Sequence, residues 1–298
     1  MRKPEREEEK TGLVIAHYGL RAHIRVGGET LELKPPRGQE WAVGDSIVFE
    51  KGRPKKILER RNALIRIGAN GKEQALAANL DLLLIVTACG EAFKPGLIDR
   101  FLVSSAHMGI PAAIVVNKMD IPEAAEFLTA AREYENYGYN VLPVSALSGS
   151  GIDGLTAMLN HKVTALVGHS GVGKTSITNR LVPGLNRLVG EVNVKTEAGR
   201  HVTTVSIFVD LPGGGAIIDS PGIRQFVPTG IDERDAAHYF PGFAPYRGMC
   251  KFRDCMHMAE PGCAIRQAVE DKSLSDERYR SYLRIIQSIR ERAEPDWA

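Results

Sequence analysis

The stretch "GHSGVGKTS" at residues 168–176 decides the fold of this chain. It fits the pattern G-x-x-x-x-G-K-[ST], and it joins an apolar segment typical of a strand (162–167) to a segment typical of a helix (174–182). A glycine-rich turn in this position wraps backbone N–H groups around phosphates, and the helix N-terminus adds the positive end of its dipole. The stretch therefore predicts a site for the phosphates of a nucleoside triphosphate.

The residues of this loop have predicted roles in nucleotide binding. Lys174 is expected to contact the β- and γ-phosphates, and the hydroxyl of Thr175 is expected to bind Mg²⁺. A coincidental glycine-rich turn is the alternative, and the flanking strand and helix argue against it. The predicted phosphate-binding residues are Gly168, His169, Ser170, Gly171, Val172, Gly173, Lys174, Thr175 and Ser176.

The stretch "VNKMD" at residues 116–120 closes an apolar strand and predicts which base the site reads. The Asp120 carboxylate can accept hydrogen bonds from N1–H and N2–H₂ of guanine, while the Asn117 side chain faces O6 and N7. Adenine presents the wrong pattern of donors and acceptors to Asp120, and unpaired buried polar groups are costly. Lys118 is expected to pack its stem across the plane of the base.

A second base-reading segment, "VSALSG" at residues 144–149, follows the next predicted strand. Ser145 and Ala146 match a Ser-Ala-x loop whose backbone N–H approaches guanine O6. Two such segments at successive strand ends favour GTP and GDP over adenine nucleotides.

The remaining parts of a GTPase site lie downstream of the phosphate loop. The stretch "AIIDSPG" at 216–222 ends a strand in Asp-x-x-Gly, so Asp219 is expected to hold Mg²⁺ through water and the Gly222 N–H to face the γ-phosphate. Between the phosphate loop and the stretch 216–222 lies a polar segment that predicts a mobile switch loop, with Thr203 or Thr204 binding Mg²⁺. The alternative is that these two threonines are only β-branched residues that begin the next strand.

The order of these motifs is unusual, because both base-reading segments precede the phosphate loop. Strand–helix alternation over 62–227 predicts a doubly wound α/β domain, and the motif order indicates that this domain resembles the circularly permuted GTPases. Permutation is physically tolerable because domain termini usually lie close together at the surface.

The segment before this domain predicts a small β-barrel. Residues 11–61 hold about five short alternating stretches separated by turn clusters, and "VGDSIVF" resembles strand entry in OB-fold modules. This segment has ten Lys and Arg against six Asp and Glu, a slight excess that hints at an anionic partner; the alternative is a barrel used only for packing. Residues 1–10 are expected to be a disordered tail.

No segment of the sequence predicts a membrane span. The longest apolar run, 82–88, is far too short to cross a bilayer, and the N-terminal residues have no apolar core. We therefore expect a cytoplasmic protein.

A Cys/His cluster follows the predicted GTPase domain and predicts a structural zinc site in residues 228–298. Three thiolates and one imidazole with the spacing C-x4-C-x-H-x5-C complete a closed tetrahedral site for one zinc ion, with no position left for a catalytic water. A disulfide would need an oxidising compartment and an even number of local cysteines. Cys89 lies far off and is expected to be a buried thiol. The predicted ligands are Cys250, Cys255, His257 and Cys263.

The C-terminal stretch predicts an amphipathic helix. Its expected apolar side is formed by Tyr279, Leu283, Ile286 and Ile289. Its arginines are expected on the other sides, facing either rRNA phosphates or solvent. They are Arg278, Arg280, Arg284 and Arg292.

The small β-barrel, the permuted GTPase and the Cys/His zinc module together resemble the ribosome small subunit-dependent GTPase A family, over essentially the whole chain after the first ten residues. The resemblance implies binding to the small ribosomal subunit and its rRNA in late maturation, and GTP hydrolysis stimulated by that subunit. We expect a monomer, since no self-pairing surface is indicated.

The predicted catalytic group is a histidine of the switch segment. Ile223 stands where many GTPases carry a glutamine that orients water, so hydrolysis by the chain alone should be slow. His201 can enter the site and position water, as the family's histidine at this place implies; a solvent-facing loop histidine is the alternative, and Arg200 can instead supply charge. The alternative function is a guanine-nucleotide-gated RNA-binding module with negligible turnover.

Overall fold

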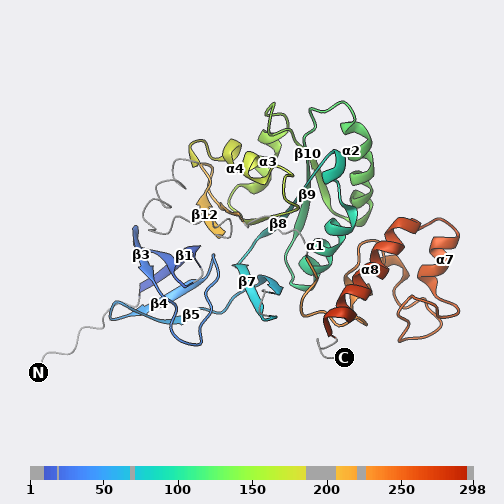
Figure 1. Ribbon diagram of the computed structural model, residues 1–298, viewed down its shortest axis with the longest axis horizontal. Helices are drawn as coiled ribbons and strands as arrows, with labels where there is room; N and C mark the ends of the chain where they lie inside the picture. The colour runs from blue at the N-terminus through green and yellow to red at the C-terminus, as the bar shows by residue number, and fades with distance from the viewer. Residues whose placement is uncertain (1–9, 19, 68–70, 186–205, 220–225, 294–298) are drawn as a thin grey trace, which may run out of the picture.

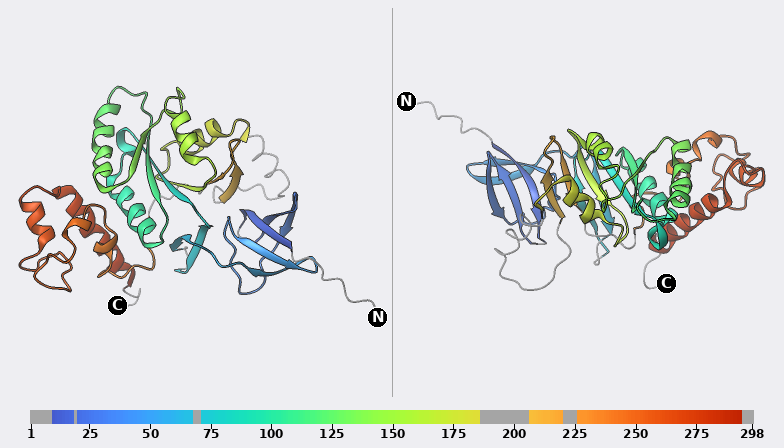
Figure 2. Two further views of the ribbon diagram at one scale, coloured as in Figure 1. Left: turned by 180° about the vertical axis from the view of Figure 1, so that it is seen from behind. Right: turned by 90° about the horizontal axis from the view of Figure 1, so that it is seen from above.

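The computed structural model describes residues 10–18, 20–67, 71–185, 206–219 and 226–293. A β-rich N-terminal part and a helical C-terminal part lie on opposite sides of a central α/β part (Figures 1 and 2). The predicted tail therefore lies outside the described residues except for Lys10, where the first strand begins.

The central part is a doubly wound α/β domain, as predicted. Five of its strands run parallel in the order β10-β9-β8-β11-β13, and β12 pairs antiparallel with β13. The strands are β8 (Leu82–Ala88), β9 (Ala112–Asn117), β10 (Asn140–Pro143), β11 (Val163–Val167), β12 (Ser206–Asp210) and β13 (Ala216–Asp219). The helical elements are η1 (Gly90–Ala92), α1 (Pro95–His107), α2 (Ala124–Arg132), η2 (Glu133–Tyr137), α3 (Ile152–Leu159) and α4 (Lys174–Leu181).

Helices cover both faces of this sheet, and β8 is accordingly apolar at every position except Thr87. Leu83 and Ile85 belong to a core with α1 and η2, whereas Leu84 and Val86 belong to a second core with α3 and α4. The alternation follows from the two-residue period of a strand, which sends successive side chains to opposite faces. All seven residues of β8 are buried.

The N-terminal part contains five strands in the order β3-β2-β1-β4-β5, which agrees with the predicted OB-fold. They are β1 (Lys10–His17), β2 (Ala22–Val26), β3 (Glu29–Leu33), β4 (Ser46–Glu50) and β5 (Arg53–Ile57). Their core surrounds the buried Trp41. β1 also pairs antiparallel with β12, with His17 opposite Ser206, so that the barrel continues the sheet of the GTPase domain.

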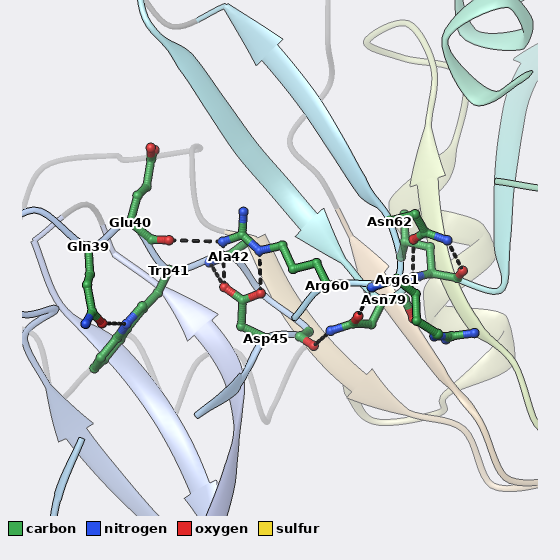
Figure 3. Close-up of polar contacts among 11 residues, drawn as sticks. Gln39, Glu40, Trp41, Ala42, Asp45, Arg60, Arg61, Asn62 and Asn79 are labelled. Carbon is green, nitrogen blue, oxygen red and sulfur yellow. Dashed lines mark hydrogen bonds and ion pairs between the residues drawn. The ribbon is translucent and has the colours of Figure 1, made fainter. Parts of the chain in front are cut away.

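An ion pair between a buried carboxylate and a partly exposed arginine fixes the end of the barrel (Figure 3). The Asp45 side chain is fully buried, and both of its oxygens are bonded by Arg60, whose Nε and Nη2 donate at 2.7 and 2.8 Å. The backbone N–H of Ala42 donates to the same carboxylate at 2.7 Å. A bidentate pair of this kind combines charge with fixed geometry.

From this ion pair a chain of hydrogen bonds runs to the strand before the phosphate loop. Asn79 donates from Nδ2 to the Gly44 carbonyl and accepts from the Arg61 N–H, each at 2.9 Å (Figure 3). Arg61 donates to Asp81, which accepts from the N–H of Val163 at the start of β11, again at 2.9 Å. The barrel is therefore bonded to the GTPase sheet at two places. One is the pairing of β1 with β12, and the other is this series of hydrogen bonds.

The prediction of strand–helix alternation beginning at residue 62 was wrong for its first part. Two strands, β6 (Ala63–Ile67) and β7 (Glu73–Ala78), instead form a separate antiparallel hairpin. The β-branched and apolar residues of "ALIRI" and the nearby Gly71, whose φ is 72°, are compatible with such a hairpin. The predicted domain boundaries at 61/62 and 227/228 stay predictions.

The C-terminal part is helical and has its own core around the buried Phe243 and Tyr282. Its elements are α6 (Ala236–Tyr239), η3 (Ala244–Tyr246), α7 (Ala264–Glu270) and α8 (Asp276–Ala293). Among the helices of the described residues, none combines the length and apolar character that a bilayer crossing requires.

The buried side of α8 differs from the predicted one. Ile286 and Ile289 are buried as expected, but Tyr279 and Leu283 are only partly buried. The positions that complete the buried side are Tyr282, Ile285, Ser281 and Arg278.

The placement of Arg278 among the outward-facing arginines was wrong. It is ion-paired with the buried Asp99 of α1, and its guanidinium lies over the ring of Tyr134 at 4.2 Å. The hydroxyl of Tyr134 donates to the same Asp99 oxygen at 2.9 Å. A helix considered alone cannot show that another domain supplies a carboxylate and an aromatic face, which together make burial of an arginine possible.

Replacing Arg278 should destabilise the protein strongly, because Asp99 would be left charged and unpaired in the interior. We expect Arg278→Met to lower the free energy of unfolding by about 3–5 kcal/mol, and Asp99→Leu combined with Arg278→Met to restore most of the loss. The control is Arg280→Ala, whose exposed pair with Asp276 should contribute less than about 1 kcal/mol. Denaturant unfolding measures all three, and equal losses for Arg278→Met and Arg280→Ala would contradict the assignment.

Candidate functional site

The predicted nucleotide-binding segments meet at one edge of the central sheet. The carboxyl ends of parallel strands lie at the same edge, where ligands bind in folds of this kind. Asn117 ends β9, Asp219 ends β13, and the phosphate loop follows β11. The second base-reading segment, 144–149, follows β10. Segments that are far apart in the sequence therefore surround one site.

The phosphate loop has the backbone that only glycine adopts easily. Gly168 and Gly173 have φ values of 146° and 95°, and α4 begins directly after Gly173. A Cβ on Gly168 would lie 2.1 Å from the carbonyl oxygen of Val86, and one on Gly173 would lie 2.2 Å from Nδ2 of Asn117. At these two positions the loop has no space for a side chain, because its backbone lies directly against β8 and Asn117, as a cradle of backbone N–H groups requires.

Lys174 crosses this loop and is nearly buried. Its Nζ donates to the carbonyl of Gly168 at 2.9 Å and to that of His169 at 3.0 Å. Burial lowers the pKa of Lys174, an effect opposed by Asp219. Burial likewise raises the pKa of Asp219, opposed by Lys174. The ammonium group still has a third N–H for a phosphate oxygen.

Asn117 connects the phosphate loop to a base-reading loop. Its side chain is buried, its Nδ2 donates to the Val172 carbonyl at 2.8 Å, and its Oδ1 accepts from the Ala146 N–H at 3.0 Å. The sequence predicted only contacts to the base. One Nδ2 hydrogen and one Oδ1 lone pair remain for those contacts, so the predicted base-reading role of Asn117 stays a prediction.

Asp120 and Lys118 are exposed beside this buried amide, as base-reading groups must be before a nucleotide arrives. The hydroxyl of Ser145 donates to Asp120 and accepts from the Ser148 N–H at 3.1 Å. Ser145 thereby joins the two predicted base-reading segments. Sequence reasoning missed Arg180, whose guanidinium bonds carbonyls of 144–149 from the end of α4. Because the contact joins distant segments, a single sequence contains no signal for it.

Several predicted site residues lie outside the described residues. They are Arg200, His201, Thr203, Thr204, Gly222 and Ile223. Of the predicted magnesium ligands, the structure describes Thr175, exposed at the start of α4, and Asp219 at the end of β13. A hydroxyl and a carboxylate suit Mg²⁺, which prefers oxygen ligands.

The four predicted zinc ligands form one cluster. Their ligand atoms lie within 4.8 Å of one another, and Nδ1 of His257 lies 3.4, 3.6 and 3.4 Å from the sulfurs of Cys250, Cys255 and Cys263. A tetrahedral zinc ion would hold its nitrogen and each sulfur about 3.5 Å apart. Cys89 is buried elsewhere, 3.9 Å from the sulfur of Met119, as predicted.

The surroundings of the cluster also suit a metal. Burial, together with the neighbouring thiols, raises the pKa of Cys255 to about 12, so three thiolates need a cation to coexist. The Glu260 carboxylate accepts the N–H groups of Met256, Met258 and Ala259, and it orders the loop that carries His257. These backbone bonds overcome the effect of burial and lower the pKa of Glu260 to about 2.

Removal of the metal should unfold the C-terminal part. We expect one zinc ion per chain by elemental analysis, and its removal by a chelator, or Cys255→Ser, should cost several kcal/mol of folding free energy, on the order expected for structural zinc. Cys89→Ser is the control and should keep the full zinc content. A chain that melts at the same temperature with and without chelator would contradict a structural role for the metal.

The parallel sheet, its phosphate loop and the base-reading segments that precede that loop in sequence define a circularly permuted GTPase. The chain belongs to the RsgA GTPase family, whose family model matches residues 57–228. Small ribosomal subunit biogenesis GTPase RsgA 1 of Vibrio vulnificus is 36% identical over 299 residues, covering 95% of this chain and 85% of that protein. The corresponding GTPase RsgA of Haemophilus influenzae is 36% identical over 298 residues, covering 95% and 86%.

Two solved structures share the fold over nearly the whole chain. YjeQ from Thermotoga maritima has a TM-score of 0.72 at 25% identity, covering 94% of this chain and 98% of that one. YloQ, described as a circularly permuted GTPase, has a TM-score of 0.70 at 26% identity, covering both chains fully. The comparisons confirm the predicted family and fold class.

Proposed function

We propose that this chain hydrolyses GTP on the small ribosomal subunit during its late maturation, and that the subunit stimulates hydrolysis. The observation that carries the proposal is the bonding of the phosphate loop to a base-reading loop through Asn117, in the order that defines the permuted family. The relatives from V. vulnificus and H. influenzae are named as biogenesis GTPases of the small subunit, which supports the choice of partner.

In this proposal different residues at the edge of the sheet bind the phosphates, the base and Mg²⁺. Lys174 and the N–H groups of 168–176 bind the phosphates, and Asp120 reads the base. Thr175 and Asp219 hold Mg²⁺, with Thr203 or Thr204 from the switch segment. The ion, when bound, neutralises charge on the β- and γ-phosphates. His201 positions the attacking water.

The surface of the N-terminal barrel supports an RNA partner. Its basic side chains are mostly exposed, and they give this part its excess of positive charge. Exposed lysines and arginines bind phosphates without reading sequence, as binding to a folded rRNA requires. They are Arg21, Lys34, Arg37, Lys51, Arg53, Lys55 and Lys56.

Phosphate release from GTP by the zinc-loaded protein tests this function. We expect slow release alone, faster release with purified small subunits, and no effect of large subunits. His201→Ala should lower the stimulated rate on the order of 100-fold, the range of a group that positions or accepts a proton, and leave GTP affinity unchanged. Tight GTP binding without stimulation by either subunit would instead favour a nucleotide-gated RNA-binding module with negligible turnover.

A further inference from the structure

The last turn of α4 carries an arginine that bonds a distant loop. Nε of Arg180 donates to the Ala146 carbonyl at 2.7 Å, and its Nη2 donates to the Leu147 carbonyl. A basic residue in this position ordinarily interacts with the carbonyls of its own helix. Arg180 is exposed, and within the described part of the chain its guanidinium bonds this loop and has no carboxylate partner.

These two bonds fix the direction of two peptide units. The C=O and N–H of a trans peptide point in opposite directions, and no described peptide bond is cis. Holding the carbonyls of Ala146 and Leu147 toward α4 therefore turns the N–H groups of Leu147 and Ser148 away from it. The side chain of Leu147 is 76% exposed, whereas Ala146 is buried in the core with α3 and α4, so packing anchors Ala146 but does not set the orientation of Leu147.

Only one N–H of this segment is left for a ligand. The Ala146 N–H is donated to Asn117 at 3.0 Å, and the Ser148 N–H is donated to Ser145 at 3.1 Å. The Leu147 N–H has no partner among the residues that the structure describes. A loop that is expected to offer an N–H to the base thus presents the one at Leu147.

We propose that Arg180 is a positioning residue that aims the Leu147 N–H at the keto oxygen O6 of guanine. The inference rests on the proposed function, because it needs a guanine nucleotide in this site. Adenine carries an amino group at the same position, so a donor aimed there favours guanine and opposes adenine. The guanidinium also polarises the two peptide units and strengthens the N–H as a donor.

Binding of three nucleotides distinguishes positioning of the Leu147 N–H toward O6 from a general effect of Arg180 on nucleotide binding. 6-Thio-GDP keeps the N1–H and N2–H₂ groups and changes only the acceptor at position 6. We expect Arg180→Ala to weaken GDP binding about 10- to 100-fold, the range for loss of hydrogen bonds to a charged group. The same variant should weaken 6-thio-GDP and ADP much less, so that discrimination among the three shrinks. Arg180→Lys should restore GDP affinity only in part, since an ammonium lacks the planar fork that spans two carbonyls.

The matched control is Arg132→Ala, the same change at the end of α2, where the exposed arginine lies outside the site. It should leave all three dissociation constants unchanged, and thermal melting checks that each variant is folded. Equal weakening of GDP, 6-thio-GDP and ADP by Arg180→Ala would overturn the inference, as would unchanged GDP binding. A wild-type protein that does not bind GDP would overturn the proposed function itself, which is a separate result.

Discussion

The buried amide of Asn117 holds the phosphate loop and the base-reading loop at a fixed separation. Its Nδ2 bonds the phosphate loop and its Oδ1 bonds the base-reading loop. The amide also fills the space where any side chain at residue 173 would have to lie. Leaving either backbone group buried without this partner would cost about 1–3 kcal/mol. The geometry of the site thus depends on the hydrogen bonds of Asn117 to the two loops. These bonds do not depend on which loop comes first in the sequence, so a permuted sequence can keep the same arrangement.

Both flanking parts are bonded to the GTPase sheet, and the C-terminal part is attached through a buried ion pair. On one side, Asp45 and Arg60 begin the bonds that lead through Asp81 to β11, and β1 extends the sheet beyond β12. On the other, Arg278 of α8 pairs with Asp99 of α1. Because separating a buried pair is expensive, the C-terminal part should keep its orientation to the central sheet unless a partner compensates the loss.

The sequence was most informative where chemistry is local. The glycine and lysine spacing of 168–176 and the spacing of the four predicted zinc ligands identified a loop and a cluster that the structure contains. Both patterns reflect contacts made within a few residues, such as those of Lys174 with the carbonyls of Gly168 and His169. It was least informative where partners are distant. The pairing of Arg278 with Asp99 and the bonds of Arg180 to 146–147 join segments that no periodicity relates. The hairpin of β6 and β7 was missed because neither strand alternates regularly: β6 is apolar at four of its five positions, and β7 has two polar residues followed by four apolar ones.

The central claim is that the loops joined by Asn117 form a guanine-specific site, and base selectivity tests it most directly. Displacement of a fluorescent GDP by GDP, ADP and XDP would be measured for the wild-type protein and for Asp120→Asn. The account predicts that GDP displaces the probe far better than ADP in the wild type. It also predicts that Asp120→Asn prefers XDP, because the xanthine carbonyl at C2 accepts a hydrogen bond where the guanine amino group donates one. Equal displacement by GDP and ADP, with no change of preference in the variant, would contradict it.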